Sequence, residues 1–120
     1  MSFEPDTTSL IETVLPAFAQ EIVALLAAAE RSNLASQVRN LRIVDRCRCG
    51  QEDCSHFYTA QKPQGAYGPG HSNLVLDTTS GMVVLDIVDG VIVAIEVLDR
   101  PDVKALLDLY LPATSGDAAG

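Results

Sequence analysis

Apolar residues recur at helical spacing near the amino-terminal end of the chain. Between residues 10 and 29 they follow a period of three to four, and Ser9 with Glu12 has the form of a capping box. Pro16 lacks an amide donor, so it should restart this helix rather than continue it. A further short helical turn is predicted over residues 34–38. The first third of the chain should therefore be a helical region.

A second helical pattern follows residue 98. Asp99 is a candidate cap, Pro101 suits a first turn, and apolar residues between 103 and 110 repeat at helical spacing. Pro112 should end this carboxy-terminal helix. Residues 1–8 and 113–120 are predicted to be flexible tails. Because no repeat or long linker divides the rest, residues 1–120 should form a single domain.

In the middle of the chain the apolar period changes to two, which is typical of strands. Residues 41–49 alternate, residues 50–53 form a turn candidate around Gly50, and residues 54–60 read as a returning strand. One face of the first strand should hold Leu41, Ile43, Asp45, Cys47 and Cys49. The other should be a basic outer face with Arg42, Val44, Arg46 and Arg48.

A second hairpin is predicted from two β-branched runs, residues 82–88 and 91–98, joined by Asp89-Gly90. A loop over 61–72 and a strand over 73–77 precede it. If Val88 faces Val91, both faces are mainly apolar, so helices should cover one and the rest of the protein or a second subunit the other. That register also sends Asp86 and Glu96 to opposite faces. The fold class is therefore α+β, with a mainly antiparallel sheet of two hairpins.

Charge limits the choice of partners. The 120 residues carry a net charge of −8, which makes nucleic acid an unlikely default partner because such binding usually rests on a basic surface. Five of the eight basic residues nevertheless lie between positions 31 and 48. One hypothesis therefore makes Arg42, Arg46 and Arg48 a contact surface for an anionic ligand or nucleic acid.

The cellular setting is predicted from what the sequence lacks. The amino terminus carries acids where a signal peptide needs basic residues, and charged residues interrupt every long apolar stretch. We therefore expect a cytoplasmic protein without a membrane segment. In that compartment, cysteines are expected to be reduced.

Three cysteines and a histidine fall within ten residues, at Cys47, Cys49, Cys54 and His56. If the first hairpin closes through residues 50–53, Cys49 lies opposite Cys54 and Cys47 opposite His56, all on one face. Zn²⁺ prefers four such ligands in a tetrahedron, and a full set leaves no open position for catalysis. The spacing thus favours a structural zinc site.

Two other interpretations of the cysteines remain open. Reduced cysteines behave as small apolar side chains, so they could simply pack in the core with Leu41 and Ile43. Alternatively, Cys49 and Cys54 could cycle between dithiol and disulfide as a redox protein or sensor. Metal content and thiol counts distinguish the three.

Two resemblances bear on the same segment. The pattern C-x-C-x4-C-x-H at residues 47–56 resembles the SWIM-type zinc finger, whose members bind DNA or protein; its spacer is usually longer. More broadly, Cys47-Arg48-Cys49-Gly50 with Cys54 and Phe57-Tyr58-Thr59 resembles small uncharacterised bacterial proteins. That second resemblance implies no activity, substrate or catalytic residue.

No pattern indicates catalysis. His71 is a lone loop histidine, and the glycine-rich loop over 65–70 lacks the Lys-Ser/Thr of a phosphate-binding loop. The sequence therefore favours a non-catalytic binding or interaction module that uses an unknown protein partner or self-association, with zinc as its candidate cofactor.

Overall fold

The computed structural model describes residues 10–61 and 63–111, and in this part of the chain helices flank a single sheet. The helices are α1 (Ile11–Val14), α2 (Pro16–Ala28), α3 (Ser32–Val38) and α4 (Pro101–Tyr110). The strands are β1 (Asp45–Arg46), β2 (Phe57–Tyr58), β3 (His71–Val75), β4 (Met82–Val88) and β5 (Val91–Leu98). They form an antiparallel sheet in the order β1-β2-β5-β4-β3, which confirms the predicted α+β class.

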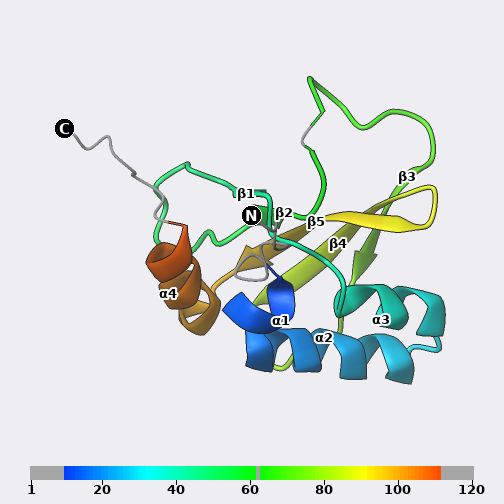
Figure 1. The fold of residues 1–120 in the computed structure, drawn as a ribbon, viewed down its shortest axis with the longest axis horizontal. Coiled ribbons are helices and arrows are strands. Elements are labelled where there is room, and N and C mark those ends of the chain that lie inside the picture. Colours follow the sequence, from blue (N-terminus) through cyan, green and yellow to red (C-terminus); the bar gives the residue numbers. More distant parts are fainter. Residues whose placement is uncertain (1–9, 62, 112–120) are drawn as a thin grey trace, which may run out of the picture.

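The helices cover one face of this sheet and bury the aliphatic core against it (Figure 1). Phe57, Ile95 and Leu85 are register partners on neighbouring strands, and all three are fully buried. Helices α1 and α2 contribute the opposite layer with Ile11, Val14, Leu15, Phe18, Ile22 and Leu26. We refer to this side as the helix-covered face and to the opposite side as the outer face.

Local signals placed the turns and the helix starts correctly in most cases. Asp89 and Gly90 both have positive φ, at 51° and 83°, as the predicted two-residue hairpin turn requires. Pro16 and Pro101 occupy the first turns of α2 and α4. The predicted cap Asp99 is wrong, because Arg100 holds the cap position without a side-chain cap bond. Ser9 and both predicted tails lie outside the described residues.

The first hairpin has the predicted register but shorter strands. Asp45 pairs with Tyr58 and Arg46 with Phe57, and the Cys47 N–H donates to the His56 carbonyl at 2.9 Å. This is the ladder that places Cys47 opposite His56. The ladder is short because the preceding segment, with Leu41 and Ile43, enters the core instead of following β2.

The predicted faces of this strand are wrong after residue 43. The Val44 N–H donates to the Tyr58 carbonyl although Asp45 is the register partner of Tyr58, so two residues stand opposite one. Such an extra residue reverses the alternation beyond it. Arg46 consequently points to the helix-covered face, and Cys47 lies on the outer face rather than beside Leu41 and Ile43.

A β-bulge in the central hairpin corrects a second prediction. Val88 pairs with Val91 and Ile87 with Ile92, but Asp86 pairs with Ala94, so Val93 has no partner on β4. Its carbonyl accepts the N–H groups of Thr59 and Ala60 instead. The bulge shifts the alternation by one residue, and Asp86 and Glu96 therefore share the outer face.

Two buried arginines link the carboxy-terminal helix to the rest of the fold. Arg100 donates to both carboxylate oxygens of Glu21 on α2, at 2.7 and 3.0 Å, and its guanidinium lies over the ring of Phe18. Arg46, from the first hairpin, donates to Asp108 at 2.8 Å and to the Leu111 carbonyl at 2.9 Å. Over residues 10–61 and 63–111, none of the helices has the length and apolar character to span a bilayer.

Candidate metal centre

The three cysteines converge at one end of the outer face. Cys47 directly follows β1, Cys49 lies in the loop before Gly50, and Cys54 forms an isolated antiparallel bridge with Leu98 beside β5. Gly50 has φ of 80°, a conformation that glycine adopts without strain. The three Sγ atoms lie within 4.8 Å of one another, close enough to hold a metal ion.

The three thiols have different surroundings. Cys49 is exposed, Cys47 is half-buried and Cys54 is buried. Hydrogen bonds from the Gln51 backbone and from the other two thiols lower the pKa of Cys49. Burial raises the pKa of Cys54 to about 11. An exposed, more acidic thiol therefore stands beside a buried, less acidic one.

His56 lies next to the cysteines but outside their close cluster. The group of atoms within 4.8 Å of one another contains three sulfurs and no ring nitrogen of His56. Its Nε2 is buried and has no hydrogen-bond partner among the described residues. Burial lowers the pKa of this imidazole and so favours the neutral ring, the form that ligates metals.

A polar network continues the outer face beyond His56. Asp86, only 4% exposed, accepts hydrogen bonds from His71 Nε2 at 2.8 Å and from Asn73 Nδ2 at 2.6 Å. A hydrogen bond with Asp86, together with burial, raises the pKa of Glu96 to about 7. The Tyr67 ring lies against His71 with centroids 4.7 Å apart.

Sequence reasoning missed this network. His71 was predicted to be an isolated loop residue, and the two acids were predicted to lie on opposite faces. The bulge at Val93 that unites the acids has no signal in the apolar pattern, since Val93 and its neighbours are all β-branched or small. A cross-strand comparison of polar residues would have found the partners only with the correct register.

The predicted basic surface does not form as expected. The side chain of Arg46 is 1% exposed and holds α4. Arg48 pairs with Asp45 at 3.2 Å on the surface, and Arg42 is half-buried. The prediction that Arg42, Arg46 and Arg48 share one exposed face is therefore wrong. The extra residue at Val44 reverses the alternation and turns the Arg46 side chain toward the helix-covered face.

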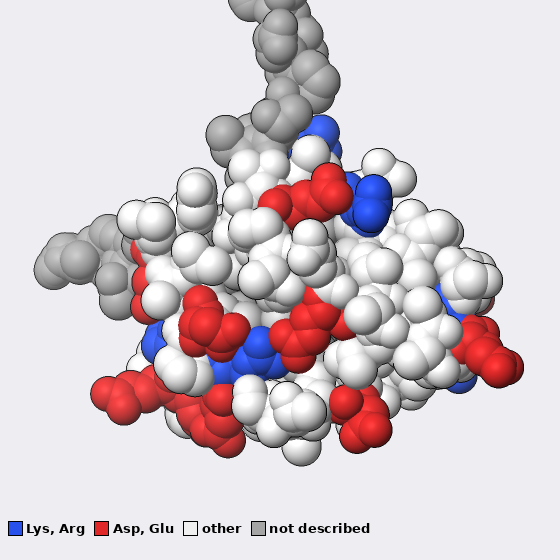
Figure 2. Space-filling model, turned by 90° about the horizontal axis from the view of Figure 1, so that it is seen from below, with Lys and Arg blue, Asp and Glu red and all other residues white. Residues whose placement is uncertain are grey.

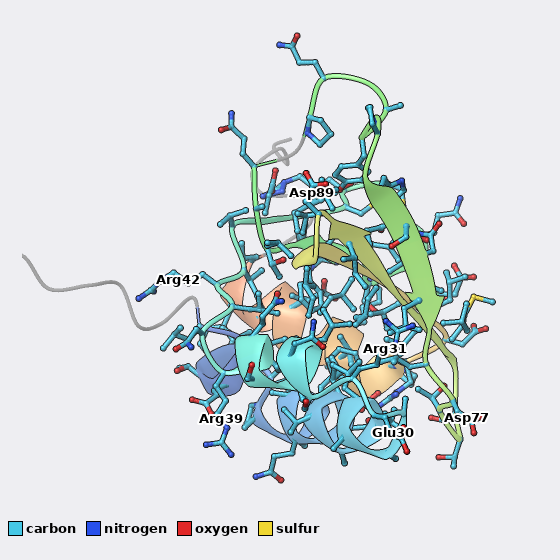
Figure 3. All side chains as sticks on the ribbon, turned by 90° about the vertical axis from the view of Figure 1, so that its right-hand side faces the viewer. Glu30, Arg31, Arg39, Arg42, Asp77 and Asp89 are labelled. Carbon is cyan, nitrogen blue, oxygen red and sulfur yellow. The ribbon has the colours of Figure 1, made fainter. Side chains whose placement is uncertain are left out.

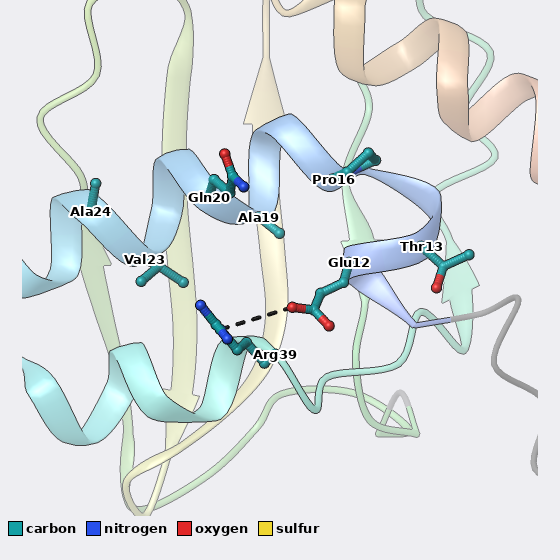
Figure 4. Close-up of a pocket in the computed structure, with 8 residues that line it drawn as sticks. All are labelled: Glu12, Thr13, Pro16, Ala19, Gln20, Val23, Ala24 and Arg39. Atoms are coloured by element: carbon teal, nitrogen blue, oxygen red, sulfur yellow. Dashed lines mark ion pairs between the residues drawn. The ribbon is translucent and has the colours of Figure 1, made fainter.

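A shallow groove on the helices lies away from these groups. It has a volume of about 690 Å³ and is lined by α1, α2 and the end of α3 (Figure 4). Glu12 and Arg39, both well exposed, form an ion pair at 3.8 Å across it. The rest of the lining is Thr13, Pro16, Ala19, Gln20, Val23 and Ala24, which contains neither histidine nor cysteine.

Known proteins add no further constraint on the site. The chain matches no protein-family model, no curated protein and no solved structure. The geometry of the described residues therefore carries the functional argument.

Proposed function

We propose that the chain is a non-catalytic binding module whose first hairpin is fixed by a zinc ion. The ligands in this proposal are Cys47, Cys49 and Cys54, with His56 as the fourth. The observation that carries it is the convergence of the three Sγ atoms within 4.8 Å. Tetrahedral Zn²⁺ with sulfur ligands at about 2.3 Å places those sulfurs about 3.8 Å apart. Small side-chain rotations suffice to reach this spacing.

The chemistry of the donors also fits zinc. Three thiolates and a neutral imidazole are borderline-soft ligands, a set that structural zinc sites use. The buried Nε2 of His56 is a polar atom that the described residues leave unsatisfied, and such atoms are rare in folded proteins. Coordination to the metal would give this nitrogen a partner and fix the orientation of the ring. A complete set of four protein ligands leaves no position for substrate, in keeping with a structural role.

The position of the cluster suggests what the ion would stabilise. Cys54 adjoins β5 through Leu98, the Asp53 carbonyl accepts the Asp99 N–H, and the neighbouring Arg46 holds α4. A metal would thus tie the loop over residues 47–54 to both ends of the segment that carries α4. The binding surface in this proposal is the rigid loop and the adjoining outer face.

Metal analysis of the purified protein tests the proposal directly. We expect one zinc per chain, and thiols that react with a thiol reagent only after chelation. Cys54→Ser should abolish zinc retention, and His56→Gln should lower zinc affinity by more than the roughly 10–100-fold typical of residues that only orient a metal ligand. His71→Gln is the matched control, since it removes the other histidine. Three reactive thiols without metal would contradict the proposal, and equal affinities of His56→Gln and His71→Gln would exclude His56 as a ligand.

A redox role for Cys49 and Cys54 is a second candidate, favoured by the asymmetry of the thiols. Cys49 is exposed to an oxidant, and Cys54 is buried within reach of it. A hydroperoxide would oxidise the two thiols to a disulfide and be reduced to water and an alcohol or a second water. Reversible loss of two thiols in zinc-free protein, abolished by Cys49→Ser but not by Cys47→Ser, would favour this role over the zinc clamp.

A further inference from the structure

The two edges of the sheet are protected very differently. The β1 edge is two residues long, carries Asp45 and Arg46, and turns the Arg46 charge inward. Short length, charges and inward-pointing ions are the devices by which natural sheets prevent edge pairing. The opposite edge, β3, has none of them: His71–Val75 contains no Lys, Arg, Asp, Glu or Pro, and its pairing with β4 is free of bulges.

Strand β3 offers unpaired backbone groups at this edge. The Leu76 N–H donates to Val83 and the Asp89 N–H to Gly70, so the even-numbered residues of this segment bond to β4. Hydrogen-bonded and non-bonded positions alternate in antiparallel ladders. The N–H and C=O groups of Asn73 and Val75 therefore point away from β4. In Figure 3, which looks onto this side, no helix or strand lies in front of β3.

Apolar side chains adjoin the same edge. Val75 is 66% exposed and pairs with Val84 on the outer face, and the half-exposed Met82 lies on that face two residues before Val84. Acidic side chains predominate on the surface seen in Figure 2, and the chain carries a net charge of −8, so two copies repel one another in most orientations. Strand β3 carries no Lys, Arg, Asp or Glu, so that repulsion is weakest along its edge.

We propose that β3 pairs antiparallel with β3 of a second copy, so that two five-stranded sheets become one continuous sheet about a two-fold axis. In the register centred on Leu74, Asn73 of each copy faces Val75 of the other. This register uses the outward N–H and C=O groups of both residues. It also brings the exposed apolar side chains of Val75 and Met82 close to the seam. The second copy is favoured as occupant because antiparallel pairing of one edge with itself is closed and leaves no further β3 edge free. The proposal does not depend on the zinc site.

Sedimentation velocity and light scattering over a range of concentrations test this pairing, in a non-thiol reductant so that Cys49 cannot cross-link chains. We expect the wild type to reach twice the chain mass of 12.8 kDa. Val75→Lys should remain monomeric at the same concentrations, because it would place two like charges diagonally across the seam on the same face of the joined sheet. Leu109→Lys, at a 71% exposed position on α4, is the matched control and should dimerise like the wild type.

Two further measurements keep the test specific to β3. Val75→Pro removes an N–H that points away from β4, so it should abolish dimers while circular dichroism shows an unchanged fold. Amide hydrogens of Asn73 and Val75 should exchange slowly in the dimer and rapidly on dilution. A monomeric wild type at all concentrations, or a dimer that survives Val75→Lys and Val75→Pro, would overturn the proposal. The first outcome would leave the edge to an extended segment of another protein.

Discussion

The two faces of the sheet differ in the side chains that they carry. The helix-covered face is apolar, with Phe57, Leu85 and Ile95 in one row under α1 and α2. The outer face carries sulfur, imidazole and carboxylate groups, from the cysteine cluster through His56 to Asp86 and His71. Folding free energy comes mainly from the first face, because apolar burial dominates stability. These metal-competent and titratable groups are concentrated on the outer face.

The largest expected difference is between Phe57 on β2 and Val84 on β4, whose side chains lie on opposite faces of the sheet. Phe57→Ala should lower the free energy of unfolding by about 3–5 kcal/mol, because a fully buried aromatic ring leaves a cavity. Val84→Ala on the outer face should cost less than about 1.5 kcal/mol, since Val84 is half-buried and its site stays open to water. Urea unfolding measures both values. Equal losses would show that the outer face is packed as tightly as the core.

Next in size is the difference between two arginines of the cysteine hairpin. Arg46→Ala should cost about 2 kcal/mol, because it strips the Leu111 carbonyl and Asp108 of a charged donor. The loss is less than for a fully buried pair because Asp108 is 46% exposed and regains water. Arg48→Ala, which breaks a surface pair with Asp45, should cost at most about 1 kcal/mol. Thermal unfolding compares them, and similar losses would argue against the reversed alternation at Val44.

The smallest expected effect is on the pH dependence of stability, to which Glu96 on the outer face contributes. The pKa of Glu96 is raised from its ordinary value to about 7 in the folded protein by its hydrogen bond with Asp86 and by burial. The folded state therefore binds this proton more tightly than the unfolded state, and Glu96 lowers stability as pH rises from about 4.5 to 7.

Glu96→Gln should remove that slope, because the amide does not titrate. The melting temperature of the variant should thus fall less between pH 5 and 7.5 than that of the wild type. His56, whose pKa is lowered, contributes a slope of opposite sign in both proteins, so the difference between the two curves isolates Glu96. Parallel curves would show that Glu96 and Asp86 share no proton.

The sequence by itself determined the elements and their order. Helical spacing, Pro16 and Pro101 located the helices, and Asp89-Gly90 located the central turn, because these signals act through neighbouring backbone. The register that places Cys47 opposite His56 followed from the length of the turn alone. The convergence of the three sulfurs was predictable for the same reason, as it depends on local closure of one hairpin.

Only the tertiary structure decided which residues face which layer. An extra residue at Val44 and the bulge at Val93 each reverse a strand's alternation. The first doubles the hydrogen bonding at Tyr58 within the same hairpin, and at the second the Val93 carbonyl accepts from Thr59 and Ala60, which are distant in the sequence. Each such shift moves every later side chain to the other face. That is why Arg46 became a buried link to α4, why Asp86 and Glu96 met, and why Cys47 lies on the outer face rather than beside Leu41 and Ile43.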